Sequence, residues 1–247
     1  MKKRIIVALD TDSPEAALET ASSLSGEVGL FKVGMELFPR GGPELVRRIR
    51  NAGTEVFLDL KFHDIPNTVE RAAAAHARRG VEIMNAHGCG GVDMLRAFAA
   101  GATEGARAAG VAVPTTLAVT VLTNFDGNDL RDMGIQWTVQ DLVTARALLA
   151  SEVGCDGVIA SGEEAAALRP DELRREPRHR DPAERPGLPR DRIPSLRSGQ
   201  PDCLVHAARA CALQIGEVHG VLPGRPQRGA AECAEIRLQL AVDVPPG

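Results

Sequence analysis

Short apolar runs alternate with helical segments through the first two thirds of this chain, and this alternation narrows the choice of fold. Strands are predicted over residues 5–9, 30–33, 56–61, 81–86, 115–122 and 157–160, with helices after Ser13 and over residues 43–52, 66–79, 92–109 and 138–150. Strands separated by helices in strict sequence belong to a parallel sheet, because parallel neighbours need a crossover connection. The chain length of 247 residues is typical of a single (β/α)8 barrel. No GxGxxG turn follows the first strand, which disfavours an open sheet that binds a dinucleotide. We therefore predict an α/β fold of the (β/α)8 TIM barrel type.

Six polar residues lie at or just beyond the carboxyl end of a predicted strand. They are Asp10, Lys32, Asp59, Lys61, His87 and Thr123. In a barrel these strand ends form one rim, where active sites lie. Any one of the six fits an ordinary solvent-facing strand end. A charge at the end of an apolar strand is costly unless it is paired or used, so the six together predict a functional site.

The segment over residues 59–68 reads DLKFHDIPNT and carries the most informative charges. Asp59 and Lys61 are two residues apart on a strand, so their side chains point to the same side. Asp64 follows in the turn that opens the next helix, and Lys32 ends the neighbouring strand. Two cations that alternate with two carboxylates keep one another ionised and titrate as a unit. A structural ion-pair network at the barrel mouth is the alternative interpretation, although the full DxKxxDIPNT string is far more specific than DxK alone.

This segment resembles the bacterial orotidine 5'-phosphate decarboxylase family. The resemblance extends to ALD at residues 8–10, FKVGMELF at 31–38, NAHG at 85–88 and VTVLT at 119–123. It covers about residues 4–168. It implies an enzyme that uses neither cofactor nor metal and converts orotidine 5'-phosphate to UMP in de novo pyrimidine biosynthesis.

The resemblance implies a catalytic set of Lys61, Asp59, Asp64 and Lys32. Lys61 would be the proton donor, and Asp59 would press on the substrate carboxylate. Decarboxylation leaves a carbanion at C6 with no electron sink, so the enzyme must stabilise this charge electrostatically and protonate it. A fixed ammonium group in a water-poor site can do both.

The resemblance also implies the substrate-binding residues. Lys32 and Asp10 would hold the ribose hydroxyls, and Thr123 would contact the pyrimidine. Asp64 and Thr68 would reach into the site of a partner subunit, which implies a homodimer.

Residues 169–247 differ in character from the residues before them. Every lysine lies at or before Lys61, most prolines follow Leu168, and residues 169–201 are dense in Pro and Arg. We divide the chain into six barrel units over residues 1–168 and an atypical part of the same domain over 169–247. Later elements are expected as a helix over 203–213, a strand over 218–222 and a final helix over 230–240, while the last two βα units are expected to be degenerate or disordered.

Two interpretations of this C-terminal part remain open: a Pro-rich disordered linker, or a segment read in a shifted frame. The gene sequence separates them, because only the second predicts a buried-strand pattern in another frame. The family's TPGIR-like phosphate loop is absent from the sequence. One remnant of its VVGR-like motif is found at Gly224 and Arg225, which we assign to substrate binding.

The composition argues against other partners and compartments. A net charge of −4 gives no electrostatic case for nucleic acid, and no stretch approaches the roughly 20 apolar residues of a membrane span. The five scattered cysteines indicate a reducing cytoplasm. The expected partner is a small molecule, orotidine 5'-phosphate.

Two other functions remain open. The first is a sugar-phosphate decarboxylase or synthase of the same suprafamily, which uses DxKxxD with a magnesium ion and lacks the IPNT continuation. The second is a catalytically impaired barrel from a damaged gene, since fold alone does not imply function. Metal dependence separates the sugar-phosphate enzyme from the cofactor-free decarboxylase that we favour.

Overall fold

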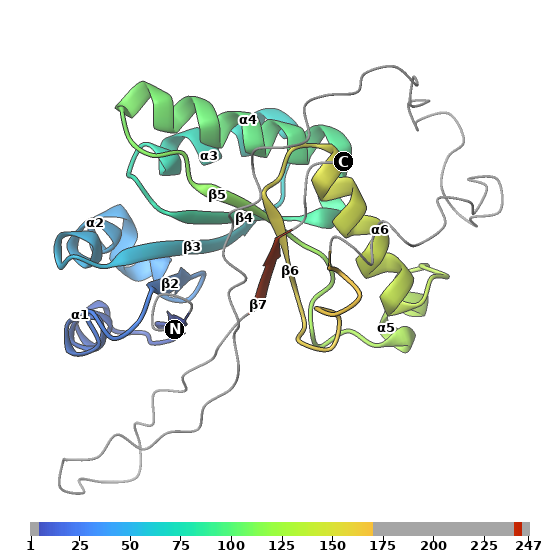
Figure 1. Ribbon diagram of the computed structural model, residues 1–247, viewed down its shortest axis with the longest axis horizontal. Helices are drawn as coiled ribbons and strands as arrows, with labels where there is room; N and C mark the ends of the chain where they lie inside the picture. The colour runs from blue at the N-terminus through green and yellow to red at the C-terminus, as the bar shows by residue number, and fades with distance from the viewer. Residues whose placement is uncertain (1–4, 170–239, 244–247) are drawn as a thin grey trace, which may run out of the picture.

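The computed structural model describes residues 5–169 and 240–243, and its strands form one sheet in chain order (Figure 1). The parallel strands are β1 (Ile6–Ala8), β2 (Leu30–Gly34), β3 (Glu55–Phe62), β4 (Ile83–His87), β5 (Thr115–Val119) and β6 (Gly157–Ala160). A further strand, β7 (Leu240–Asp243), pairs antiparallel with β6. All six strands predicted in the first two thirds are confirmed.

Helices connect these strands and lie outside the curled sheet (Figure 1). They are α1 (Pro14–Ser23), α2 (Phe38–Asn51), α3 (Pro66–Ala77), the short 3-10 turn η2 (Gly88–Gly90), α4 (Gly91–Ala109), α5 (Gly127–Asp132) and α6 (Val139–Glu152). This alternation of parallel strands and helices confirms the predicted α/β barrel architecture over the first six units. Among the described helices, none is long and apolar enough to cross a membrane.

Two apolar layers pack on the two faces of the sheet. Alternate strand residues such as Phe31 and Leu58 join the helices in the larger cluster. The intervening residues form a smaller inner cluster of Ile6, Leu30, Phe57, Ile83, Leu117, Val119 and Ile159. Side chains alternate between the two faces along a strand. A residue that lies two positions after a member of the inner cluster on the same strand therefore also points inward.

Three expectations differ from the structure. The segment between the fifth strand and the helix expected over 138–150, for which no helix was predicted, contains α5, which Asp126 starts through a reciprocal capping box with Asp129. The fifth strand ends at Val119 rather than at residue 122. The final helix was expected to reach Leu240, and this is wrong, because Leu240 starts the strand β7. The other elements expected over 203–239 lie outside the described residues.

Glu82, which precedes β4, forms hydrogen bonds with α2 and β3 at the amino-terminal side of the sheet. Its Oε1 accepts hydrogen bonds from Arg50 Nε and Nη2 at 3.2 and 2.8 Å, and its Oε2 accepts from the backbone N–H of Val56 at 2.7 Å. Arg50 also donates to the carbonyl oxygen of Arg79 at 3.1 Å. This one carboxylate therefore joins the last turn of α2 to the start of β3 and the approach to β4.

Glu82→Ala is expected to lower the free energy of unfolding by about 1 to 2 kcal/mol, because it leaves a partly buried guanidinium and a backbone donor without their acceptor. Glu82→Gln keeps an acceptor for Val56 and should lose less. Urea denaturation of the three proteins measures the difference. Equal midpoints for wild type and Glu82→Ala would show that water replaces the carboxylate at no cost.

Candidate active site

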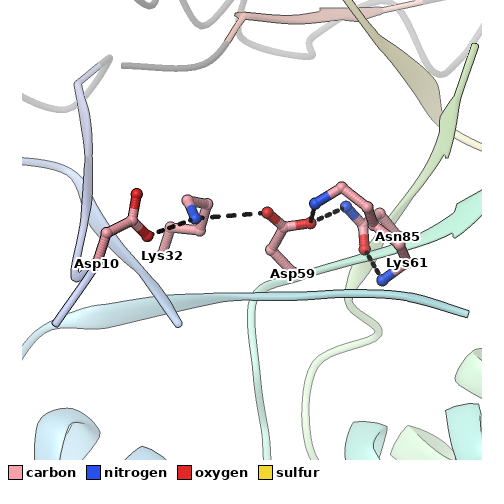
Figure 2. A network of polar contacts seen from close by, with 5 residues as sticks. All are labelled: Asp10, Lys32, Asp59, Lys61 and Asn85. Atoms are coloured by element: carbon pink, nitrogen blue, oxygen red, sulfur yellow. Dashed lines mark hydrogen bonds and ion pairs between the residues drawn. The ribbon is translucent and has the colours of Figure 1, made fainter. Parts of the chain in front are cut away.

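Four charged side chains form a continuous row at the carboxyl ends of β1, β2 and β3 (Figure 2). Lys32 Nζ lies 3.1 Å from Asp10 Oδ1 and 3.5 Å from Asp59 Oδ2. Lys61 Nζ donates a hydrogen bond of 2.7 Å to Asp59 Oδ1. The order Asp10, Lys32, Asp59, Lys61 thus alternates in charge. The sequence predicted this alternation with Asp64 as the second carboxylate, and in the structure Asp10 takes that place.

The strand period explains why these side chains meet. Lys32 lies two residues beyond Leu30, and Asp59 lies two residues beyond Phe57, so both project to the same face as the inner apolar cluster. Lys32 is 8% exposed and Asp59 is 2% exposed. Because a buried charge is stable only when it is paired, each of these groups requires its neighbours in the row.

Asn85 of β4 completes the network, and its role was not predicted. Its Nδ2 donates to Asp59 Oδ1 at 2.6 Å, and its Oδ1 accepts from the backbone N–H of Lys61 at 2.8 Å. The side chain is fully buried. The signal in the sequence was a polar residue at an inward position of an otherwise apolar strand, where an amide needs partners from the site.

Lys61 adopts a left-handed backbone conformation with φ of 49°. It is the only non-glycine residue with positive φ in the described part of the chain, and the pairing of β3 with β4 shifts register between Leu58 and Phe62. A side chain with a Cβ adopts this conformation at a cost of about 1 to 2 kcal/mol. Asn85 holds the N–H of the same residue, so the bend that directs Lys61 at Asp59 is fixed by the site itself.

The environment favours the ionised form of Asp59. Burial alone would raise the pKa of this carboxyl, but the charges of Lys32 and Lys61 and the hydrogen bonds from Lys61 and Asn85 outweigh it and lower the pKa below its usual value. Asp59 therefore stays negative at neutral pH although water scarcely reaches it.

The lowered pKa makes the stabilising contribution of Asp59 sensitive to acid. This contribution is complete above the unfolded pKa of about 3.9 and is lost as the pH falls through the lower folded pKa. Asp59→Asn is therefore expected to show a flatter dependence of unfolding free energy on pH between about 5 and 3 than the wild type. Urea titrations at several pH values measure both slopes. Parallel curves would mean that Asp59 titrates alike in the folded and unfolded chain.

Other predicted site residues lie apart from the row in this chain. Asp64 is exposed, and its Oδ1 accepts from the N–H of Ile65 at 2.7 Å. Thr68 lies exposed on the first turn of α3, and Thr123 lies exposed in the loop after β5. Within the described ranges, no hydrogen bond or ion pair joins these three residues to the row. Gly224 and Arg225 lie outside the described residues.

Two histidines flank the row. The rings of His63 and His87 lie 5.5 Å apart between centroids, and His63 Nε2 lies 3.9 Å from Cys89 Sγ. Burial, followed by the positive charges of His63, Lys61 and Arg146, lowers the pKa of His87. A neutral His87 adds no positive charge to compete with Lys61 for Asp59.

The arrangement suits electrostatic catalysis with proton transfer. An ammonium group that is held in place can stabilise a negative charge developing beside it and then donate a proton. A buried carboxylate next to that ammonium disfavours a second negative group at the same place, such as a substrate carboxylate.

Comparisons with known proteins place these residues in a family. The sequence model of the orotidine 5'-phosphate decarboxylase / HUMPS family matches residues 3–185. A protein of Syntrophotalea carbinolica named orotidine 5'-phosphate decarboxylase is 48% identical over 172 residues, which cover 68% of this chain and 69% of the relative. One of the same name from Moorella thermoacetica is 48% identical over 169 residues, covering 68% and 67%.

Solved structures agree with the sequence comparisons. The crystal structure of orotidine 5'-phosphate decarboxylase from Lactobacillus acidophilus matches with a TM-score of 0.62 and 38% identity, covering 65% of this chain and 72% of that one. An uncharacterized conserved protein from Geobacillus kaustophilus matches with a TM-score of 0.62 and 37% identity, covering 68% and 85%. With its alternating charged row at the strand ends and a family match over residues 3–185, the chain belongs to the orotidine 5'-phosphate decarboxylase / HUMPS family.

Proposed function

We propose that this chain converts orotidine 5'-phosphate to UMP and carbon dioxide without a cofactor, as a step of pyrimidine biosynthesis in the cytoplasm. The observation that carries the proposal is the buried row, in which Asp59 is held between the ammonium groups of Lys32 and Lys61. The relatives named orotidine 5'-phosphate decarboxylase support the choice of substrate.

In the proposed reaction, the bond between C6 and the carboxylate carbon breaks, and its electron pair remains on C6 while carbon dioxide leaves. Lys61 stabilises this carbanion and transfers a proton from Nζ to C6, and solvent then restores the proton on Lys61. Asp59 lies beside the substrate carboxylate and destabilises it until it departs. Binding of the remote ribose and phosphate offsets this cost.

The remaining residues bind the substrate in this proposal. Lys32 and Asp10 hold the ribose hydroxyls, and their 3.1 Å contact orients both groups. Thr123 contacts the pyrimidine from the loop after β5. Gly224 and Arg225 are proposed to bind the phosphate.

Sensitivity to a chelator tests this function against the magnesium-dependent alternative within the family. The purified full chain is treated with EDTA, and turnover of orotidine 5'-phosphate is followed through the loss of its ultraviolet absorbance. We expect the same rate before and after treatment. A rate that collapses with EDTA and returns with Mg²⁺ would favour the sugar-phosphate class of chemistry.

A second part of the proposal is a homodimer in which Asp64 and Thr68 act in the partner's site. The supporting observation is that both side chains are exposed and lie apart from the row of their own chain, next to Ile65, which is 66% exposed.

Lys61→Ala and Asp64→Ala are each expected to be inactive alone and to regain activity when they are expressed together. In a mixed dimer one site lacks both groups and the other has both, so mixed dimers purified through both tags should carry about half of the wild-type sites. Co-expression with two affinity tags, followed by the absorbance assay, measures this. Inactive mixed dimers would place Asp64 in its own subunit's site or outside any site.

A further inference from the structure

Arg146 of α6 reaches the end of β5 from outside the sheet. Its Nη1 donates a hydrogen bond of 2.5 Å to the carbonyl oxygen of Thr120, the first residue after that strand. The guanidinium is partly buried, and this burial lowers the pKa of Arg146. Withdrawing an arginine side chain from water is unfavourable unless its hydrogen bonds compensate. The hydrogen bond to Thr120 therefore offsets part of the cost of burying Arg146.

Thr120 is held from a second direction as well. Its backbone N–H and its Oγ1 both donate to the carbonyl oxygen of Ile159 on β6, at 3.1 and 3.0 Å. Thr120 is 1% exposed. Its N–H, hydroxyl and carbonyl groups are therefore all engaged, and Arg146 supplies the one partner that comes from a helix.

The turn after β4 packs against the same arginine. A Cβ added to Gly88 would lie 2.9 Å from the carbonyl oxygen of Val119 and 3.4 Å from Cβ of Arg146, so no side chain fits between this turn and the end of β5. The next residue, Cys89, contacts His63 in the segment that follows β3. Arg146 thus lies next to the carboxyl end of β5 and next to the turn that follows β4. The same turn contacts His63, the residue that follows β3.

From these contacts we propose that Arg146 is a positioning residue, which fixes the exit of β5 and so places Thr123 for contact with the substrate base. Thr123 lies three residues beyond the carbonyl that Arg146 holds, and it makes no hydrogen bond with the charged row in the described part of the chain. The inference rests on the proposed function only through the role of Thr123. It concerns binding of the base, because Arg146 touches none of Asp59, Lys32 or Lys61.

Hydrogen exchange tests the positioning role without substrate. In Arg146→Met, which keeps the apolar stem and removes the donors, the amides of residues 121–126 are expected to exchange about tenfold faster, as befits loss of one charge-assisted hydrogen bond. Arg146→Lys keeps a donor and should lie between the two. Arg96→Met, at an exposed arginine of α4, is the matched control and should exchange as the wild type does. A folded Arg146→Met with unchanged exchange in this segment would overturn the proposal.

Steady-state kinetics on orotidine 5'-phosphate test the consequence for binding. Arg146→Met is expected to raise KM about tenfold and to change kcat less than about threefold, with partial rescue by Arg146→Lys. In a Thr123→Ala background the same substitution should raise KM no further, because it acts through Thr123. An equal rise in both backgrounds, or a fall in kcat with faster exchange throughout the sheet, would overturn the proposal. Absence of wild-type turnover would instead refute the proposed function, and the exchange result would still decide the role of Arg146.

Discussion

Lys61→Ala is expected to lower kcat for decarboxylation of orotidine 5'-phosphate by at least about 10³-fold, because in the proposed mechanism it removes both the proton donor and the charge nearest the carbanion. Substrate binding should change less, since Lys32 and Asp10, which are proposed to hold the ribose, remain. The loss should therefore appear mainly in kcat rather than in KM. Absorbance assays at saturating substrate measure it.

The control for this substitution must separate chemistry from folding. Asp59 keeps Lys32 as an ionic partner in Lys61→Ala, but it loses its 2.7 Å hydrogen bond, so some loss of stability is expected. The variant is compared at a temperature where circular dichroism shows it folded. Arg47→Ala, at an exposed pair with Glu44, should keep wild-type turnover. A folded Lys61→Ala variant that turns over at the wild-type rate would remove Lys61 from the mechanism.

Gly105→Ala is expected to destabilise the chain by about 2 to 3 kcal/mol, as overpacking of a tight interior does. Gly101 and Gly105 are four residues apart and face α3 from α4. A Cβ at Gly105 would lie 2.2 Å from the carbonyl oxygen of Ala74, and one at Gly101 would lie 2.2 Å from that of Glu70. These are backbone atoms, so the two helices must move apart to admit the methyl group.

Helix propensity opposes this prediction and so makes it informative. Alanine is favoured over glycine inside a helix by about 1 kcal/mol, and without the close contact the substitution would stabilise the protein. Gly127→Ala is the control, because its Cβ would meet only Arg131 Nη1, at 3.5 Å. Denaturant unfolding ranks the three proteins. A Gly105→Ala variant as stable as Gly127→Ala would mean that α3 and α4 are less tightly packed than the structure indicates.

The sequence predicted the structure correctly where burial of the strands leaves a recognisable pattern of apolar residues. Runs such as residues 5–9 and 157–160 are apolar because both faces of a parallel strand are covered, and they were located to within a few residues. The charged row followed in part from the same period, since Lys32 and Asp59 project inward from their strands. Lys61 reaches Asp59 through its left-handed bend, which the strand period does not predict. The alternation of charge in the row then followed from the cost of burying any one charge alone.

Interactions between distant residues were not accessible in the same way. The two hydrogen bonds of Asn85 to Asp59 and Lys61 depend on the register of β3 against β4, which shifts at that point. The strand β7 pairs with β6 across more than 70 residues of sequence, and no local pattern distinguishes its four residues from the end of a helix. The helix α5 was missed although Asp126 and Asp129 carry its capping signal, because six residues are too few to show a period.

The most direct test of the account is a product assay with the purified full chain and orotidine 5'-phosphate. We predict that one UMP and one carbon dioxide form for each substrate consumed, as measured by chromatography of the nucleotides and capture of the gas, and that this turnover disappears with Lys61→Ala. A folded, dimeric chain that consumes no orotidine 5'-phosphate would contradict the account, because the charged row at the strand ends would then not form a working active site.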